Sequence, residues 1–389
     1  MSLAALRWTT LFTILFMSLS GCGYFRGAAS DEDSDLTDLD DIEKAQPLDR
    51  ETTAAAVQEL VPQEGVLELK LKVDDRFPLS KTVEQRLTQT DSNGINVSTS
   101  QTEMMLSLVV DEVLPDGRKR MTVHYHRVNY MQDIRGRKVS YSSDRPGEPI
   151  PPEALLYAGL ANNGFSFWVG PNNKVMEVVG FNDFLRRCLR SVPSHHVAAV
   201  QQQLEATKGE DGIANFIDDS IGLLPYSNDP EHPGVAVKEG TRWELEPRRT
   251  EAPIPMLVTT ECMLKELTAS SAEILLTGRI NGPPEPVLMR GAGGNMKVLV
   301  RGGYCTGTCR VDRKTGLPTQ SQLHRELELA MELPDGQTVR QNKVTVSTIK
   351  SFLSQSDPGD SRVQQTSFRN AAGSENHRHV QQATGSRPN

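Results

Sequence analysis

The chain has 389 residues, of which 37% are hydrophobic, and a formal net charge of −8 at pH 7. Ten acids and two bases between Asp31 and Glu51 account for all of this charge, so the rest of the chain is neutral overall. A neutral body lacks the basic face that nucleic acids require, and the composition therefore argues against nucleic acid as a partner.

The amino terminus has the pattern of an export signal. Arg7 precedes the apolar run Trp8–Met17, which is shorter than the ~20 apolar residues of a membrane span. The run leads to Leu19-Ser-Gly-Cys22, which resembles a bacterial lipobox, whose cysteine thiol receives a diacylglycerol. We therefore predict a signal peptide over residues 1–21 and attachment of the mature chain to a membrane through lipid on Cys22.

The lipid on Cys22 sets the expected location of the chain. Two or more acyl chains hold a protein stably on a bilayer, whereas one gives only marginal binding. Gly23 favours the outer membrane, because an aspartate at that position of bacterial lipoproteins favours retention in the inner one. The body is then expected in the cell envelope, facing the periplasm or the exterior.

Two segments have the composition of disordered chain. Residues 22–61 carry the acidic run and form a predicted tether, about 35 Å in r.m.s. length as a flexible coil. Residues 354–389 are rich in Gln, Ser, Asn, Arg and His and form a predicted tail. The folded body is therefore expected over residues 62–353.

Two-residue alternation of apolar and polar residues runs through most of this body and predicts β-strands. The alternation begins at Val66–Val73. Met105–Val113 and Arg120–Val128 are predicted to form a hairpin around Leu114-Pro-Asp-Gly117. In such a turn, proline presets φ, aspartate bonds its own backbone and glycine takes the left-handed position.

Three further hairpins are expected from the same pattern. They are Phe165–Val169 with Lys174–Val179, Met256–Leu267 with Ser271–Ile280, and Leu323–Met331 with Thr338–Ile349. The last pair turns at Leu333-Pro-Asp-Gly336, so one turn sequence occurs twice and indicates an internal repeat or one architecture used twice. Hairpins in series predict an antiparallel meander, whose apolar face must be covered.

A helical insert over about residues 181–224 is the expected cover. Phe181, Phe184, Leu185, Cys188 and Leu189 fall on one face at helical spacing, and helical character continues to Leu224. The fold class is therefore predicted as α+β, mainly β. We expect a large curved antiparallel sheet, a meander or half-barrel, with a few helices packed on its concave face.

Several turns and strand ends of the body resemble an uncharacterised family of bacterial envelope lipoproteins. The matching strings are Phe167–Phe181, Val237–Trp243 and Val311–Pro318. The family is a domain of unknown function whose members share a lipobox, a low-complexity tether and a β-rich body. The resemblance implies that fold and supplies no catalytic residue. In architecture alone, the body is also similar to envelope carriers of the outer-membrane lipoprotein carrier type, whose half-barrel sheets hold acyl chains.

Besides Cys22, the chain has four cysteines, namely Cys188, Cys262, Cys305 and Cys309. An even number in an oxidising compartment permits two disulfides of open connectivity, with inert thiols or a zinc site as alternatives. On one strand, the Cα atoms of Cys305 and Cys309 lie about 13 Å apart. A disulfide requires less than about 7 Å, so the two pair with each other only if Thr306-Gly-Thr308 is a turn. On one strand, each would have to pair with Cys188 or Cys262.

His124 and His126 flank Tyr125 on a predicted strand, so both side chains point the same way. Such a pair can hold zinc when a third ligand comes from a neighbouring strand. The sequence has neither a His-Glu-x-x-His nor a Gly-x-Ser-x-Gly motif. We therefore expect no catalytic residue, no cofactor and no metal, with a metal-dependent hydrolase that uses the two histidines as the remaining enzyme alternative.

Trp168, Phe181 and Phe184 are a possible lining of an apolar groove, with the helical insert as its lid. For Trp168, core packing is the favoured interpretation and the groove is the alternative. The sequence thus predicts a non-enzymatic envelope lipoprotein that binds a lipid, another apolar ligand or an envelope protein. The alternative is a structural component of an envelope assembly.

Overall fold

The computed structural model describes residues 64–92, 94–190, 192–206, 221–227, 234–250, 254–291 and 294–352. The predicted signal peptide, Cys22, the tether 22–61 and the tail 354–389 lie outside the described residues. The described chain is mostly β-strand, which confirms the predicted class. Within it, no helix combines the length and the apolar character needed to cross a membrane.

The elements follow one another along the chain with few helices among many strands. In order they are β1 (Gly65–Leu67), β2 (Arg76–Asp91), β3 (Gly94–Val113), β4 (Lys119–Ile134), β5 (Arg137–Ser142), the 3-10 turn η1 (Pro152–Ala154), α2 (Leu155–Leu160), β6 (Asn163–Val169), β7 (Val175–Val179), α3 (Phe181–Leu189), α4 (Ser194–Ala206), β8 (Val235–Val237), β9 (Arg242–Thr250), β10 (Met256–Leu267), β11 (Ser271–Asn281), β12 (Val287–Gly291), β13 (Gly294–Asp312), β14 (Pro318–Glu332) and β15 (Thr338–Ser351).

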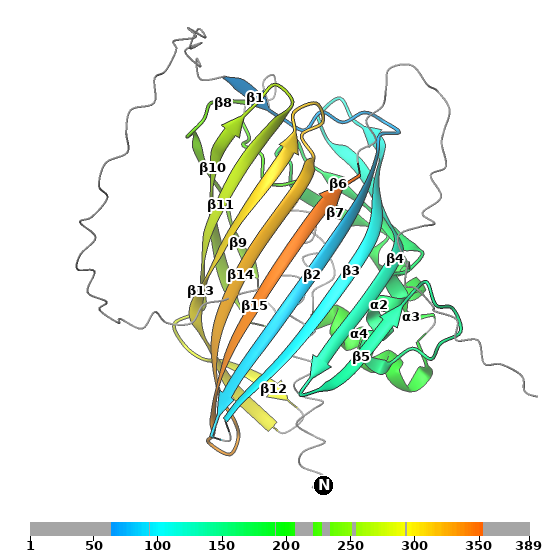
Figure 1. Ribbon diagram of the computed structural model, residues 1–389, viewed down its shortest axis with the longest axis vertical. Coiled ribbons are helices and arrows are strands. Elements are labelled where there is room, and N and C mark those ends of the chain that lie inside the picture. The colour runs from blue at the N-terminus through cyan, green and yellow to red at the C-terminus, as the bar shows by residue number, and fades with distance from the viewer. Residues whose placement is uncertain are drawn as a thin grey trace, which may run out of the picture. The chain divides into compact units, whose positions relative to one another are not determined.

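One antiparallel sheet of 13 strands contains nearly all of them, in the order β7-β6-β4-β3-β2-β15-β14-β13-β11-β10-β9, with β5 on β4 and β12 on β13 (Figure 1). Strands β1 and β8 pair with each other in a separate two-stranded sheet. Each half of the large sheet is largely a series of hairpins, as predicted. The halves join at the centre, where β2 pairs with β15 from Thr90–Arg340 to Leu79–Ser351.

The two Leu-Pro-Asp-Gly turns have the same geometry. In each, the glycine amide donates to the leucine carbonyl, at 3.0 Å for Gly117 and 2.9 Å for Gly336. Both glycines have positive φ, 85° and 81°. The aspartate Oδ1 accepts the amide of the residue after the glycine, Arg118 or Gln337. The sequence therefore placed both hairpins correctly, because the turn chemistry is local.

Alternate side chains of the long strands face inward and form two apolar clusters. The larger cluster joins strands from both halves, for example Phe77, Leu108, Phe167, Leu264 and Val311. Because β6 and β10 lie near opposite ends of the strand order yet share this cluster, the sheet is strongly curved. The smaller cluster joins side chains of β10, β11, β13, β14 and β15 near the β12–β13 hairpin. It includes Met296, Leu329 and Val339.

The helices pack against the inner face beside β4 and β6, which confirms the predicted arrangement (Figure 1). Tyr157 of α2 stacks on Tyr130 of β4, with ring centroids 4.3 Å apart. Phe184 of α3 meets Phe165 of β6 edge to face at 5.1 Å. Such aromatic pairs add to the stabilisation that burial alone supplies.

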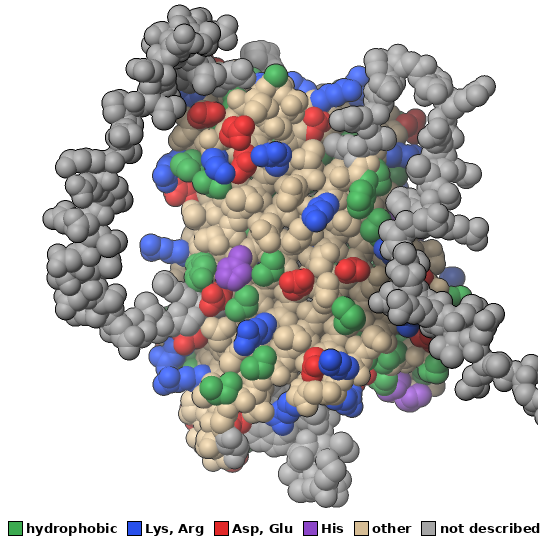
Figure 2. Space-filling view, viewed as in Figure 1, with side chains coloured by type: hydrophobic (Ala, Val, Ile, Leu, Met, Phe, Trp, Pro, Cys, Tyr) green, Lys and Arg blue, Asp and Glu red, His purple; other side chains and the backbone are tan. Residues whose placement is uncertain are grey.

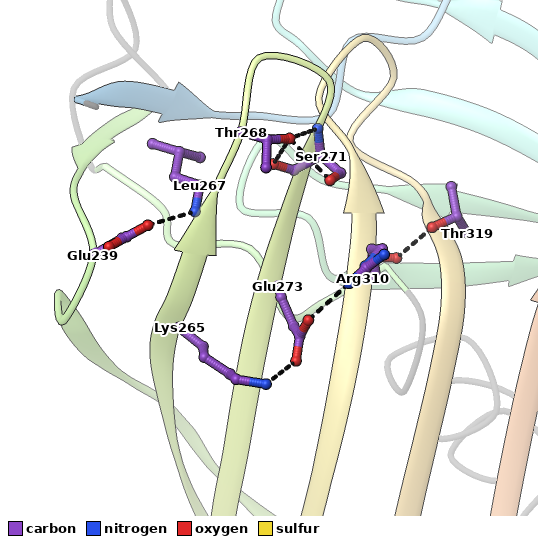
Figure 3. A network of polar contacts seen from close by, with 8 residues as sticks. All are labelled: Glu239, Lys265, Leu267, Thr268, Ser271, Glu273, Arg310 and Thr319. Carbon is purple, nitrogen blue, oxygen red and sulfur yellow. Dashed lines mark hydrogen bonds and ion pairs between the residues drawn. The ribbon is translucent and has the colours of Figure 1, made fainter. Parts of the chain in front are cut away.

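The outer face of the sheet mixes charged, polar and single hydrophobic side chains (Figure 2). Across β10, β11 and β13 it carries an ion-pair ladder centred on Glu273. The Glu273 carboxylate accepts hydrogen bonds from Lys265 at 2.6 Å and from Arg310 at 3.0 Å (Figure 3). The turn between β10 and β11 is closed by Thr268, whose Oγ1 accepts the Ser271 amide at 2.9 Å (Figure 3).

Two predicted elements are corrected. The strand expected over Val66–Val73 ends at Leu67, although Leu69 and Leu71 are still buried and Lys70 donates its amide to the Thr315 carbonyl. The helical insert does not extend to Leu224, because the described segment 221–227 is non-helical and Leu223 accepts the Trp243 indole N–H at 3.0 Å. Residues 207–220 of the insert lie outside the described chain.

Candidate functional site

Polar side chains interrupt the apolar inner face at the centre of the sheet. Along β15, the inward positions change from apolar Val339 through Gln341, Lys343, Thr345 and Ser347 to apolar Ile349. On β2, the inward positions after Leu79 include Lys81, Gln85 and Gln89. All of these except Ser347 are at least nine-tenths buried.

These residues belong to a continuous band that we call the inward belt. It consists of Lys81, Gln85, Gln89, Ser100, Thr102, Tyr130, Gln132, Arg325, Gln341, Lys343, Thr345 and Ser347.

The register in which the strands pair brings the belt residues into rows across the sheet. Thr345 lies opposite Arg325 on one side and Gln85 on the other, Gln85 lies opposite Ser100, and Ser100 opposite Gln132. This row therefore crosses the five strands β14, β15, β2, β3 and β4. With neighbouring strands about 4.8 Å apart, the row is about 19 Å wide.

Several belt side chains have buried polar atoms without a hydrogen-bond partner in the protein. The atoms are Gln85 Oε1, Gln89 Nε2, Tyr130 Oη, Gln132 Oε1 and Nε2, Gln341 Nε2, Thr345 Oγ1 and Ser347 Oγ. They include amide donors, amide acceptors and hydroxyl groups that can do either. The row through Gln85, Thr345 and Gln132 thus presents both kinds of group on one face.

The cost of this arrangement is large. Each buried polar atom that lacks a partner destabilises a fold by about 1–3 kcal/mol. A polar ligand group or ordered water at the belt would remove this cost.

The predicted aromatic groove is only partly assembled. Phe181 and Phe184 lie together, with ring centroids 6.1 Å apart, and Phe184 is buried against Phe165. Trp168 does not join them. It alternates with the inward Phe167 and Val169 and lies under the Arg118 guanidinium, 5.8 Å from the ring centroid. The prediction for Trp168 is therefore corrected, because a one-residue step along a strand reverses the face.

No disulfide joins the described cysteines Cys188, Cys262, Cys305 and Cys309, all of which are buried. Cys305 and Cys309 lie on the single strand β13, as the spacing argument required. Burial raises the pKa of the Cys188, Cys262 and Cys309 thiols to about 12. Burial therefore keeps the thiols of Cys188, Cys262 and Cys309 protonated near neutral pH, and the pairing of the four cysteines in disulfides stays a prediction.

His124 and His126 point to the same side, with ring centroids 4.7 Å apart. His126 Nε2 lies 2.8 Å from the Ser107 hydroxyl, and burial, followed by the charge of His124, lowers the pKa of His126. Within the described residues, no group of three or more His, Cys, Asp or Glu side chains gathers at a point. The third ligand that the hydrolase alternative needs is thus not found there.

A shallow groove of about 620 Å³ lies on the outer face, across β15, β2, β3, β4 and β5. Its outward lining includes Val344, Val346 and Met131, and Met131 is 52% exposed. Along β3 the exposed Val97 and Ile95 follow. Its lining also includes Gln85, Ser100 and Gln132 of the inward belt.

Sequence reasoning did not identify the inward belt. In β15 the apolar Val344 and Val346 alternate with the belt residues, so alternation there indicates the opposite face as the buried one. A usable signal was the phase of the two-residue alternation along β2. Gln85 and Gln89 occupy the same alternate positions of β2 as Phe77 and Leu79, whose side chains face inward. The cross-strand assembly of the row could not be read from one sequence, because it depends on the β2–β15 pairing.

Comparison with known proteins gives one match to a family model. The family is described as "Family of unknown function (DUF6263)", and its model matches residues 116–318, more than half of the chain. No curated protein matches the sequence.

Solved structures match at low similarity. Lipovitellin, from a study of its lipid–protein interactions, has a TM-score of 0.40 at 11% identity, over 75% of this chain and 26% of its own. The beta domain of the Bordetella autotransporter BrkA has 0.19 at 14% identity, over 72% and 100%. A DUF1329 family protein from Desulfovibrio piger has 0.14 at 9% identity, over 72% and 88%. This chain therefore spans about a quarter of lipovitellin.

Proposed function

The chain belongs to the DUF6263 family, which is described as of unknown function. We propose that it is a lipid-anchored envelope protein that binds an apolar or amphiphilic ligand on the concave face of its sheet. Cys22 carries the lipid, residues 22–61 space the body from the membrane, and the outer membrane is the expected location. Binding is the whole activity in this proposal, and no reaction is catalysed.

One observation carries the proposal: the inward belt of buried, unpartnered polar atoms lies between two apolar clusters. On β15, a ligand that spanned the belt would meet Ile349 of the larger cluster on one side and Val339 of the smaller on the other. Its polar group would give partners to the belt, and its apolar parts would cover the flanks. Helix α3, with Phe181 and Phe184, is the natural cover.

The test is mass spectrometry of organic extracts from the whole chain with Cys22→Ala, which avoids the lipid anchor, purified from an exporting host. A lipid present in stoichiometric amount supports the proposal. A second exported protein, purified in the same way from the same strain, controls for carry-over. If the chain yields no more extractable ligand than this control, the proposal is wrong.

A second candidate function is a structural role in an envelope assembly, and the outer groove favours it. Exposed hydrophobic side chains in the groove and beside it along β3, Met131 and Ile95 among them, form a surface of the kind that partners cover. In that case Met131→Lys should release the protein from a high-mass complex in solubilised membranes. Unchanged elution of the variant would reject this role for the groove.

A further inference from the structure

Four uncharged polar side chains form one row of the inward belt. They are Thr345 on β15, Gln85 on β2, Ser100 on β3 and Gln132 on β4, which lie opposite one another in successive strand pairs. Thr345, Gln85 and Gln132 are 4%, 6% and 3% exposed, and each has a buried polar atom without a hydrogen-bond partner. We call these four residues the neutral row.

The unpartnered atoms of the neutral row require both donors and acceptors from a ligand. Gln85 Oε1 only accepts hydrogen bonds, and the Thr345 hydroxyl can donate or accept. Gln132 lacks a partner on Oε1 and on Nε2, so its amide needs a donor and an acceptor whichever way it is turned. An ionised carboxylate offers acceptors alone and an ammonium group offers donors alone, whereas a hydroxyl offers both. A ligand that carries hydroxyl groups therefore matches the row better than an ion does.

The width of the neutral row requires several hydroxyl groups. Thr345 and Gln132 lie three strand spacings apart, which is about 14 Å. Unpartnered atoms occur at both of these ends and at Gln85 between them. A single alcohol group cannot contact both ends, whereas the hydroxyls of a sugar point in several directions around its rings. The row thus has the extent and the chemistry of a site for a neutral saccharide.

The surface becomes more apolar along the strands, away from the neutral row. The next row, two residues further along each strand, is mixed and consists of Ser347, Val83, Thr102 and Tyr130. In the row after that, Ile349, Met104 and Val128 are buried members of the larger apolar cluster, and the fourth residue is Lys81. These apolar side chains lie about 13 Å along the strands from the neutral row. An apolar chain attached to the saccharide could therefore lie against the larger cluster.

From these observations we propose that the neutral row binds the uncharged sugar head group of an amphiphile, with the apolar chain of the ligand against the larger cluster. This inference rests on the proposed function and specifies the chemistry of its ligand. Sugar hydroxyls donate to Oε1 of Gln85 and of Gln132, and others accept from Gln132 Nε2 and pair with the Thr345 hydroxyl. Recognition depends most on Gln132, because both atoms of its amide gain a partner.

The test measures binding to the whole chain with Cys22→Ala, stripped of extractable lipid, by isothermal titration calorimetry. The probes share one chain length and differ in head group: decyl maltoside, 1-decanol, decanoate and decylammonium, each below its micelle-forming concentration. Maltose is the head group alone. We expect decyl maltoside to bind at least about tenfold more tightly than the other three amphiphiles, because only its head group offers several donors and acceptors. Maltose should bind more weakly than decyl maltoside, because it lacks the apolar chain.

Substitutions in the neutral row identify the site. Gln132→Leu removes both unpartnered amide atoms, so it should reduce the preference for decyl maltoside over 1-decanol at least about fivefold and leave 1-decanol binding unchanged. Thr345→Val removes one hydroxyl at nearly constant volume and should reduce the same preference by a smaller factor. Gln322→Leu is the matched control, because Gln322 is an exposed glutamine on β14, and it should change none of the affinities. Near-ultraviolet circular dichroism of each variant shows that the fold is retained.

The contrary results differ from one another. If 1-decanol, decanoate or decylammonium binds as tightly as decyl maltoside, the ligand-binding function stands and the sugar site is rejected. If maltose binds as tightly as decyl maltoside, the site takes a free sugar and the amphiphile is rejected. If none of the amphiphiles binds, the proposed function itself fails. A preference for decyl maltoside that both Gln132→Leu and Thr345→Val leave unchanged would overturn the neutral row as its site.

Discussion

At the scale of single residues, Asn163 has the most connected side chain at the junction of sheet and helices. Its Nδ2 donates to the Gly159 carbonyl and to Cys188 Sγ, both at 3.2 Å. Its Oδ1 accepts the Gly164 amide and Arg187 Nε, both at 2.9 Å. One buried amide therefore ties α2 and α3 to the first residues of β6, and no other residue type offers two donors and an acceptor of that shape except glutamine.

We predict that Asn163→Ala lowers the free energy of unfolding by about 2–3 kcal/mol, because it leaves buried groups on both helices without a partner. Urea unfolding of the Cys22→Ala chain measures the change. Gln337→Ala is the control, since this side chain is exposed at a turn, and it should stay within ~0.5 kcal/mol of the parent. Equal stability of both variants would contradict the role given to Asn163.

The buried thiols give a second prediction at this scale. With their pKa raised to about 12, Cys188, Cys262 and Cys309 carry almost no thiolate at pH 8, and burial blocks access to them. The folded Cys22→Ala chain should therefore react very slowly with a thiol reagent at pH 8. In denaturant without reductant, all four thiols should react. Fewer than four would mean that disulfides form after all.

At the scale of elements, the Lys265–Glu273–Arg310 ladder holds three strands together on the outer face (Figure 3). Hydrogen bonds from Lys265 and then Arg310 lower the pKa of Glu273 below its ordinary value of 4.5. A carboxyl group with a lowered pKa in the folded state stabilises the protein above its unfolded pKa, and this stabilisation is lost as the pH falls through the folded pKa.

Glu273→Gln should therefore destabilise the protein by about 0.5–1 kcal/mol at pH 7, a modest value because both cationic partners are half exposed. The difference from the parent should shrink below pH 4.5 as the Glu273 carboxyl of the parent becomes protonated. Urea midpoints at pH 7 and at progressively lower pH check this. A difference that stays constant across this pH range would exclude the ion pairs as its cause.

Local chemistry made most elements predictable, and long-range contacts decided the rest. The hairpins at Gly117 and Gly336 follow from turns of four residues, so one sequence sufficed to place them. The segment after Leu67 alternates equally well but finds no strand partner. Leu69 and Leu71 are buried there as irregular chain instead. The sequence predicted the burial of Leu69 and Leu71 correctly. It did not predict strand pairing correctly, because pairing depends on a neighbouring strand.

The candidate site shows the same limit. Phe181 and Phe184 were found because they repeat at helical spacing within a few residues. The inward belt was not identified from the sequence, because Gln85 and Thr345 become neighbours only when β2 pairs with β15, which lie far apart in the sequence. Polar residues at inward positions also contradict the rule that locates cores. Functional positions are where such departures are expected.

At the scale of the whole molecule, the proposed membrane anchor rests on one atom, the Cys22 sulfur. Cys22→Ala should move the exported protein from the membrane fraction to the soluble fraction. Fractionation followed by immunoblotting measures this, and Cys188→Ala is the control, because its thiol lies in the folded core. Retention of the Cys22→Ala protein on membranes would show a different anchor.

The pairing of β2 with β15 also has a consequence for folding. Thr90 lies beside Arg340, 250 residues further along the chain, so the central ladder closes only after the last strand has emerged. Contacts this distant in sequence form slowly, because a long loop must close first. Until then β2 and β14 each present an unpaired edge, which is the kind of surface that aggregates. The chain therefore passes through a vulnerable interval that ends when β15 becomes available for pairing.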